Sequence, residues 1–210
     1  MTFTGVFLDA ISGQPLPSLG VRACSAADPP CAQPLATTVA GPDGTSTLTF
    51  DSLAKSKFFE GYLEISGMAL GAHYDVLFYV FPPPTTDTDI SRILVSIEST
   101  KLLASAVNVA VDDSRGHAFF GFKDCRFNTA ADVSIAASTA DAETQRFFVV
   151  NGSPSTTAAS SPAGLGGFLD VPPGLTTFTA SSTPLCLKYS SPALFVRAGW
   201  LTEADLLPSP

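Results

Sequence analysis

The chain has 210 residues, enough for one large domain or two ordinary β domains. It carries 11 basic and 19 acidic residues, a net charge of −8, which excludes nucleic acid and anionic membrane surfaces as partners because both attract a basic face. Charged residues make up only 14% of the chain. Much of the surface is therefore small and neutral, as in a secreted β-sandwich or in a protein that buries surface against copies of itself.

The first half of the chain predicts short strands separated by turns. The expected strands are 5–8, 21–24, 35–40, 45–50, 59–65 and 74–81. The sequence GPDG at 41–44 is a strong turn signal. The run YDVLFYVF is apolar almost throughout and predicts a central strand buried on both faces. Three prolines at 82–84 end this series, so we expect a first domain over residues 1–86.

Residues 87–113 are expected to connect two domains. A strand is predicted over 90–97, and a short helix over 101–109, where apolar residues recur at helical spacing. The sequence DDSRG at 112–116 marks the boundary, so the second domain is expected over residues 114–210.

The second half predicts another set of strands, and its clearest stretch is 164–180. Glycines open it, a strand follows, Pro172-Pro173-Gly174 forces a turn, and a second strand places Thr176 and Phe178 on one face. The other expected strands are 117–122, 133–136, 146–150 and 194–198, with a hairpin turn at Asn151-Gly152. The sequences at 5–9 and 121–124 resemble each other, as do those at 41–44 and 164–167, which predicts an internal repeat of about 110 residues.

Four cysteines predict two disulfides. Cys24 and Cys31 bracket a short, turn-rich loop, and Cys125 and Cys186 both lie in the second half, so pairing within halves is the most natural of the three connectivities. Disulfides place a protein outside the cytosol. The alternatives are free buried thiols and a zinc site, which is disfavoured because the chain has no CxxC spacing and its two histidines lie far from the cysteines in sequence.

Two stretches of sequence resemble a known family. GVFLDAISGQPL at 5–16 follows the opening pattern G-x-V-x-D-x-x-T-G-x-P-L, with Ser12 in place of threonine, and VRAC at 21–24 follows the next strand. VPPGLTTF at 171–178 follows the closing pattern V-P-P-G-x-Y except at the tyrosine. The chain resembles the carboxypeptidase regulatory-like family. The resemblance implies an all-β fold of two tandem antiparallel β-sandwich domains, transthyretin-like or Ig-like, from a secreted or surface-anchored bacterial protein without catalytic residues.

The sequence predicts no catalytic residue, cofactor or metal. It has no G-x-S-x-G elbow and no phosphate-binding glycine loop followed by lysine. His73 stands beside Tyr74 and Asp75, which invites a triad interpretation, but we interpret it as a histidine at the edge of a buried strand, and His117 likewise. Two acidic pairs offer oxygen ligands for calcium without the spacing of a calcium loop, and are interpreted as solvated or capping residues. They are Asp87 with Asp89, and Asp112 with Asp113.

The expected function is a structural one outside the cytosol. The start of the chain lacks the basic and apolar regions of a signal peptide, and no run approaches the roughly 20 apolar residues of a membrane span. We expect a protein that is exported and assembles with itself, as an oligomer or fibre, or with another surface protein. The alternatives are a carbohydrate- or ligand-binding module, with Phe58, Phe59 and Tyr62 as a contact cluster, and an accessory piece of a larger enzyme.

Overall fold

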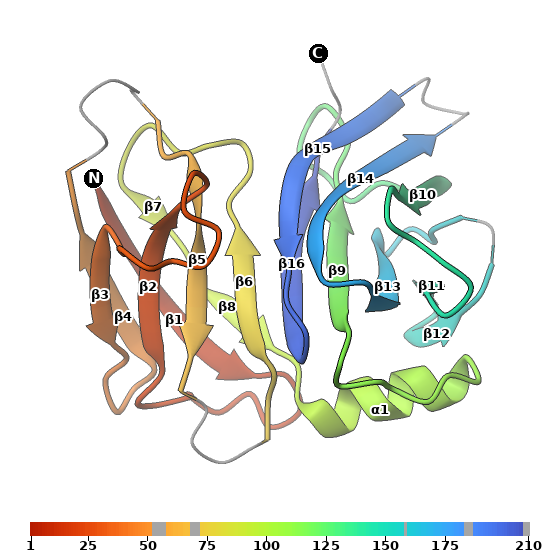
Figure 1. Cartoon of the computed structure of the whole chain (residues 1–210), viewed down its shortest axis with the longest axis horizontal. Coiled ribbons are helices and arrows are strands. Elements are labelled where there is room, and N and C mark those ends of the chain that lie inside the picture. The colour runs from red at the N-terminus through yellow and green to blue at the C-terminus, as the bar shows by residue number, and fades with distance from the viewer. Residues whose placement is uncertain (52–57, 68–71, 158, 183–186, 208–210) are drawn as a thin grey trace. The chain divides into compact units, whose positions relative to one another are not determined.

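The structure is a computed structural model, and it describes residues 1–51, 58–67, 72–157, 159–182 and 187–207 (Figure 1). Strands dominate the described residues, which confirms the all-β prediction, and their single α-helix is α1 (Ile97–Ala106). That helix is too short to span a membrane. No helix among the described residues is both long enough and apolar enough to do so. The chain divides into two compact units, Met1–Thr100 and Lys101–Pro210.

The first unit consists of two sheets. Its strands are β1 (Thr2–Asp9), β2 (Gly20–Ser25), β3 (Ala36–Val39), β4 (Thr45–Thr49), β5 (Gly61–Ser66), β6 (Asp75–Tyr79), β7 (Thr88–Asp89) and β8 (Arg92–Leu94). One sheet centres on β1, which pairs antiparallel with β4 and parallel with β7 and β8. The other runs β3-β2-β5-β6, all antiparallel. Phe3 on β1 packs edge-on against Phe59, just before β5, so the two sheets share one core.

The second unit also consists of two sheets. Its strands are β9 (Gly116–Phe122), β10 (Val133–Ala137), β11 (Gln145–Val150), β12 (Ser153–Ser155), β13 (Leu165–Val171), β14 (Gly174–Ser182), β15 (Leu187–Val196) and β16 (Trp200–Leu206). One sheet runs β12-β11-β13-β9-β16 and the other β10-β14-β15. Phe178 on β14 joins them, because its ring lies 4.7 Å from Phe120 and 5.7 Å from Phe168 between ring centroids.

The two units share a strand order. In each, the first strand lies between a later antiparallel strand and the last strand of the unit, which runs parallel to it: β1 between β4 and β7–β8, and β9 between β13 and β16. In each, the second strand pairs in the opposite sheet, β2 with β5 and β10 with β14. An immunoglobulin constant domain differs, because its first and second strands share a sheet. The units differ in the partner of the third strand: β3 pairs with β2, whereas β11 pairs with β13.

Several strand predictions are confirmed in detail. Residues 76–79 of β6 are all buried, as a strand covered on both faces requires. Thr176 and Phe178 of β14 face the core together. Asn151 and Gly152 both have positive φ in the turn between β11 and β12, as a type I′ hairpin requires. The predicted correspondence between 41–44 and 164–167 is not seen, because 41–44 lies in a turn while most of 164–167 lies in β13.

The segment predicted to connect the domains is divided between the two units, with 87–100 in the first and 101–113 in the second. β7 and β8 pair with β1, where a single strand over 90–97 was expected. The helix begins at Ile97 instead of Lys101, because the hydroxyl of Ser96 accepts the N–H of Ser99 at 3.1 Å and caps its first turn. Its last turn contributes Ala104 to a buried apolar cluster of the second unit.

Candidate functional site

The first predicted disulfide is present. Cys24 and Cys31 are bonded, and the hydroxyl of Tyr62 donates to the carbonyl of Pro29 at 2.6 Å inside the closed loop. The described residues contain one group of three potential metal ligands, Cys24, Cys31 and Glu64. Its two sulfurs are bonded to each other and Arg22 pairs with the carboxylate, so the group offers no donor set for zinc.

The second predicted disulfide involves one described residue. Cys125 is a free, exposed cysteine in the structure, in the turn that follows β9. Its expected partner, Cys186, lies outside the described residues. The bridge between Cys125 and Cys186 is therefore not part of the described structure and stays a prediction.

The aromatic residues proposed for ligand contact do not form a common surface. Phe59 and Tyr62 are buried, and only Phe58, with 37% of its surface accessible, is exposed. The ring of Phe59 contacts Phe3, and Tyr62 packs against Tyr79 with 5.2 Å between ring centroids. The cluster is not a surface because β5, which begins at Gly61, carries Tyr62 into the core.

The first histidine takes part in a turn, not in a triad. His73 lies just before β6, as predicted, but its partner is Asp9 and not Asp75: Nε2 lies 2.8 Å from the Asp9 carboxylate. That carboxylate also accepts the N–H of Ser12 at 2.6 Å and its hydroxyl at 2.7 Å. The bonds from Ser12, with that of His73, hold the pKa of Asp9 well below its usual range. The aspartate stands between serine and histidine, whereas a triad needs histidine beside the serine.

The second histidine is buried beside an aspartate. His117 on β9 is fully buried, and its Nδ1 accepts the N–H of Asp170 at 3.2 Å. Burial lowers the pKa of His117 to about 4, with the charge of Asp113 opposing that shift, and burial raises the pKa of Asp170. Perturbed groups of this kind mark catalytic sites or structural networks. Here both side chains lie in the interior, with His117 0% and Asp170 3% accessible.

An arginine completes this network. Asp170 has a positive φ of 53° in an irregularity of β13, and Nε–H of Arg115 donates to its carbonyl at 2.6 Å. The same guanidinium binds Asp141 and Glu143, each at 2.7 Å. These contacts hold the bent strand, which is a structural role. Sequence reasoning missed Asp170, although a lone acid in the apolar run GGFLDV was the available signal.

Three of the four acidic residues considered for calcium bind backbone N–H groups. Asp87 accepts the N–H of Thr2 at 2.6 Å, and Asp89 accepts that of Ser91 at 2.7 Å. Asp112 accepts the N–H of Ser114 at 2.8 Å, and this bond is the largest cause of the lowered pKa of Asp112. Asp89 and Asp112 therefore cap turns, whereas Asp87 bonds its segment to the start of β1.

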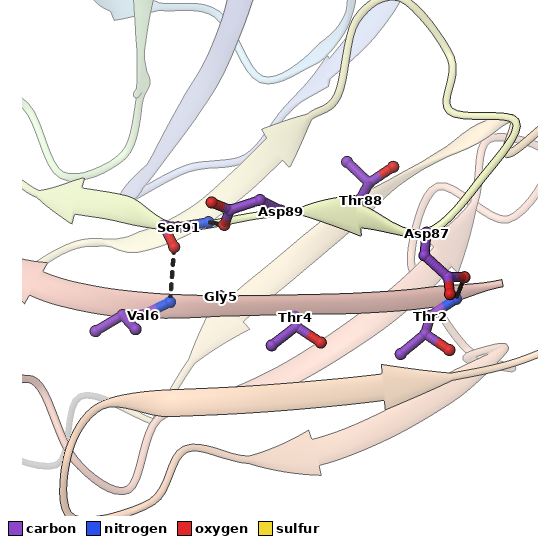
Figure 2. A pocket seen from close by; sticks show the side chains of 8 residues that line it. All are labelled: Thr2, Thr4, Gly5, Val6, Asp87, Thr88, Asp89 and Ser91. Atoms are coloured by element: carbon purple, nitrogen blue, oxygen red, sulfur yellow. Dashed lines mark hydrogen bonds between the residues drawn. The ribbon is translucent and has the colours of Figure 1, made fainter.

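A polar groove of about 440 Å³ follows β1 (Figure 2). Segment 87–91 crosses here so closely that a Cβ on Gly5 would lie 2.6 Å from the backbone nitrogen of Ser91. The hydroxyl of Ser91 accepts the N–H of Val6 at 3.0 Å and takes the place of a strand partner. The groove thus offers hydroxyls and two carboxylates without a histidine, cysteine or aromatic ring. It is lined by Thr2, Thr4, Gly5, Val6, Asp87, Thr88, Asp89 and Ser91.

The free edges of the sheets differ between the units. At the edge of the second unit, the hydroxyl of Ser160 accepts the N–H of Val133 on β10 at 3.1 Å, and Arg146 donates to the carbonyl of Ile135 at 3.3 Å. At the edge of the first unit, β3 has no such side-chain bond among the described residues. Its Val39 is 63% exposed. An uncovered, uncharged edge is a place where another strand can pair.

The chain was compared with known proteins. No protein family matches it, and neither does any curated protein. Among solved structures, the Bacillus anthracis TIE protein is similar at a TM-score of 0.32 and 7% identity over 99% of this chain, which spans 34% of that structure. The shaft pilin SpaA from Lactobacillus rhamnosus GG has a TM-score of 0.27 and 11% identity, with 100% of this chain and 97% of that chain covered. A streptococcal ancillary pilin has a TM-score of 0.29 and 13% identity, with 100% and 62% covered. TM-scores this low do not establish a common fold.

Proposed function

We propose that this protein is a non-catalytic structural subunit that acts outside the cytosol, at a cell surface, and assembles with copies of itself or with another surface protein. The observation that carries the proposal is the contrast between occupied side chains and an open strand. Asp9, His73, His117 and Asp170 are engaged in holding turns and strands. The edge of β3 is not engaged in this way among the described residues.

The residues that carry the family resemblance support a scaffold role. Gly5 permits the close crossing of segment 87–91, and Asp9 holds the turn that follows β1. Phe178, at the end of the closing pattern, fills the core between two sheets. These three motif residues therefore have structural reasons for their identity. We propose on this basis that the two units are tandem transthyretin-like sandwich domains.

The disulfide supports the proposed location. The bridge between Cys24 and Cys31 closes a loop that leads toward β3. Such bridges persist in oxidising surroundings such as the cell exterior and are rare in the cytosol.

Sedimentation of the purified protein over a series of concentrations, with electron microscopy at the highest, tests the proposal. We expect oligomers or fibres whose share rises with concentration, as mass action requires. A chain that sediments as a monomer throughout contradicts self-assembly and leaves only the hetero-association arm, which a pull-down with surface proteins of the source then tests.

A second candidate, binding of a carbohydrate or another hydroxylated ligand, rests on the groove of Figure 2. Thr2, Thr4 and Asp89 offer hydroxyl and carboxylate groups there. Sugar sites combine such groups with an exposed ring, and no ring lines this groove. A glycan array distinguishes this candidate from the first: binding that is lost in Thr4→Val favours it, and uniform silence removes it.

A further inference from the structure

The backbone of β3 has two residues whose hydrogen-bonding groups face away from the sheet. The N–H of Ala40 donates to Leu19 on the side of β2, at 2.8 Å. Orientation alternates along a strand, so Ala36 and Thr38 also bond toward β2. Thr37 and Val39 therefore direct their N–H and C=O groups outward.

No charged residue protects this edge. Natural sheets commonly guard an edge with lysine, proline or a bulge. Here every residue from 29 to 42 is uncharged, although the whole chain has a net charge of −8. Val39 adds an exposed β-branched side chain to the outward row. A neutral edge on an acidic protein is the place where two copies approach with the least repulsion.

We propose that β3 pairs antiparallel with β3 of a second copy, about a two-fold axis through Thr38. This inference rests on the proposed self-assembly and names the surface that carries it. In this register Thr37 of one copy lies opposite Val39 of the other, and the outward N–H and C=O groups of both residues bond reciprocally. The sheet β3-β2-β5-β6 then continues into the same sheet of the second copy. The interface is isologous, because both copies contribute the same strand.

The neighbouring edge strand does not serve as well. β4 is also uncharged, and Thr45, Thr47 and Thr49 alternate with the residues that bond β1. A two-fold pairing about Thr47, however, places Asp43 of one copy opposite Asp51 of the other at both ends of the ladder. Like charges directly opposite each other destabilise a strand pair. The charge pattern therefore selects β3 as the self-pairing edge.

A cysteine at the two-fold axis tests the register. The two copies of Thr38 form a non-hydrogen-bonded pair, with Cα atoms expected about 4.5 Å apart, a separation that suits a disulfide. In a background that carries both Cys125→Ser and Cys186→Ser, Thr38→Cys is expected to give an inter-chain bridge between the introduced cysteines, identified by peptide mass spectrometry. Thr37→Cys, one residue away, and Thr47→Cys on β4 are the controls, and neither is expected to bridge to its own copy.

A charge on the edge tests its energetic role. Val39→Lys is expected to weaken association about tenfold or more, because the two lysines would lie diagonally across the strand pair on one face, where like charges repel. Ile93→Lys on β8 is the matched control: Ile93 is 62% exposed and Val39 63%, and the control is expected to leave association unchanged. The melting temperature of both variants at low concentration reports whether the monomer remains folded.

The outcomes separate the two proposals. A disulfide between two copies of the Thr38→Cys variant, together with dissociation of Val39→Lys, supports both proposals. Oligomers that persist in Val39→Lys, without a bridge in Thr38→Cys, overturn the β3 register and leave self-assembly standing. A wild-type chain that stays monomeric at every concentration overturns self-assembly and the β3 interface together.

Discussion

The edges of the two units show how similar sheets acquire different surfaces. In the second unit, Ser160 bonds the N–H of Val133 and Arg146 bonds the C=O of Ile135, so two outward groups of β10 are occupied within the chain. In the first unit, β3 carries the same kind of small, neutral residues without that cover. The strand sequences alone look alike, ATTV and VSIAA. Distant side chains, and not the strands themselves, therefore decide which edge is available for pairing.

The largest expected effect separates stability from association. Phe178→Ala removes a fully buried ring between the sheets of the second unit and is expected to destabilise that unit by about 3–5 kcal/mol. The single tryptophan, Trp200, lies on β16 and reports unfolding of this unit in urea. If association belongs to the first unit, it survives the substitution at low urea. Loss of association with the second unit's fold counts against the assignment.

A smaller effect is expected in the loop before β3. Cys31→Ser opens the bridge to Cys24, whose closed loop, at a sequence separation of 7, corresponds to about 2 kcal/mol by the chain-entropy relation. Calorimetry measures the change, and Cys24→Ser, which opens the same bridge, is expected to show the same loss. Unequal losses, or no loss in either variant, disagree with the pairing described.

The side-chain bonds to the backbone of β10 are expected to contribute slightly less to stability than the disulfide. Ser160→Ala leaves the N–H of Val133 without its partner in a buried setting and is expected to cost about 1–2 kcal/mol. The control is Ser134→Ala, whose hydroxyl is on the exposed face of the same strand. If covering groups are what separates the two units, Ser160→Ala also gains concentration-dependent association in light scattering. A variant that is destabilised without any gain shows that the exposed backbone alone is insufficient.

The last effect is a pH dependence of the second unit between pH 6.5 and 4. The pKa of His117 falls from 6.5 to about 4 on folding, so in this window the unfolded chain takes up a proton that the folded chain does not. Stability therefore decreases as the pH falls from 6.5 towards 4. The raised pKa of Asp170 acts in the opposite direction and reduces the net slope. Urea unfolding followed at Trp200 measures it, and His117→Asn is expected to flatten the curve; an unchanged slope rejects His117 as its source.

Local sequence patterns predicted the strands whose burial follows from their own residues. The apolar run of β6 and the alternation of β14 fix their burial without reference to any partner. The roles of β7 and β8 were out of reach because they depend on pairing with β1, far away in sequence. The helix start was missed for a local reason, since Ser96 is a capping residue whose signal was present.

The candidate site was harder to predict than the fold. The sequence placed His73 at the edge of a buried strand, but it did not indicate that Asp9 holds His73 or that Asp170 contacts His117. The open edge was invisible for the same reason. Ser160 lies 27 positions from Val133, and only the folded chain shows that its hydroxyl bonds the edge strand β10. The structure likewise had to show that β3 has no such bond among the described residues.

Hydrogen exchange of individual backbone amides tests the central claim most directly, because it reports each edge residue separately. The account predicts that the amides of Thr37 and Val39 exchange rapidly in dilute protein and slow markedly as the concentration rises. It also predicts that the amide of Val133 is protected at every concentration. Rapid exchange at Thr37 and Val39 in concentrated protein, with association occurring all the same, contradicts the claim that copies meet at β3.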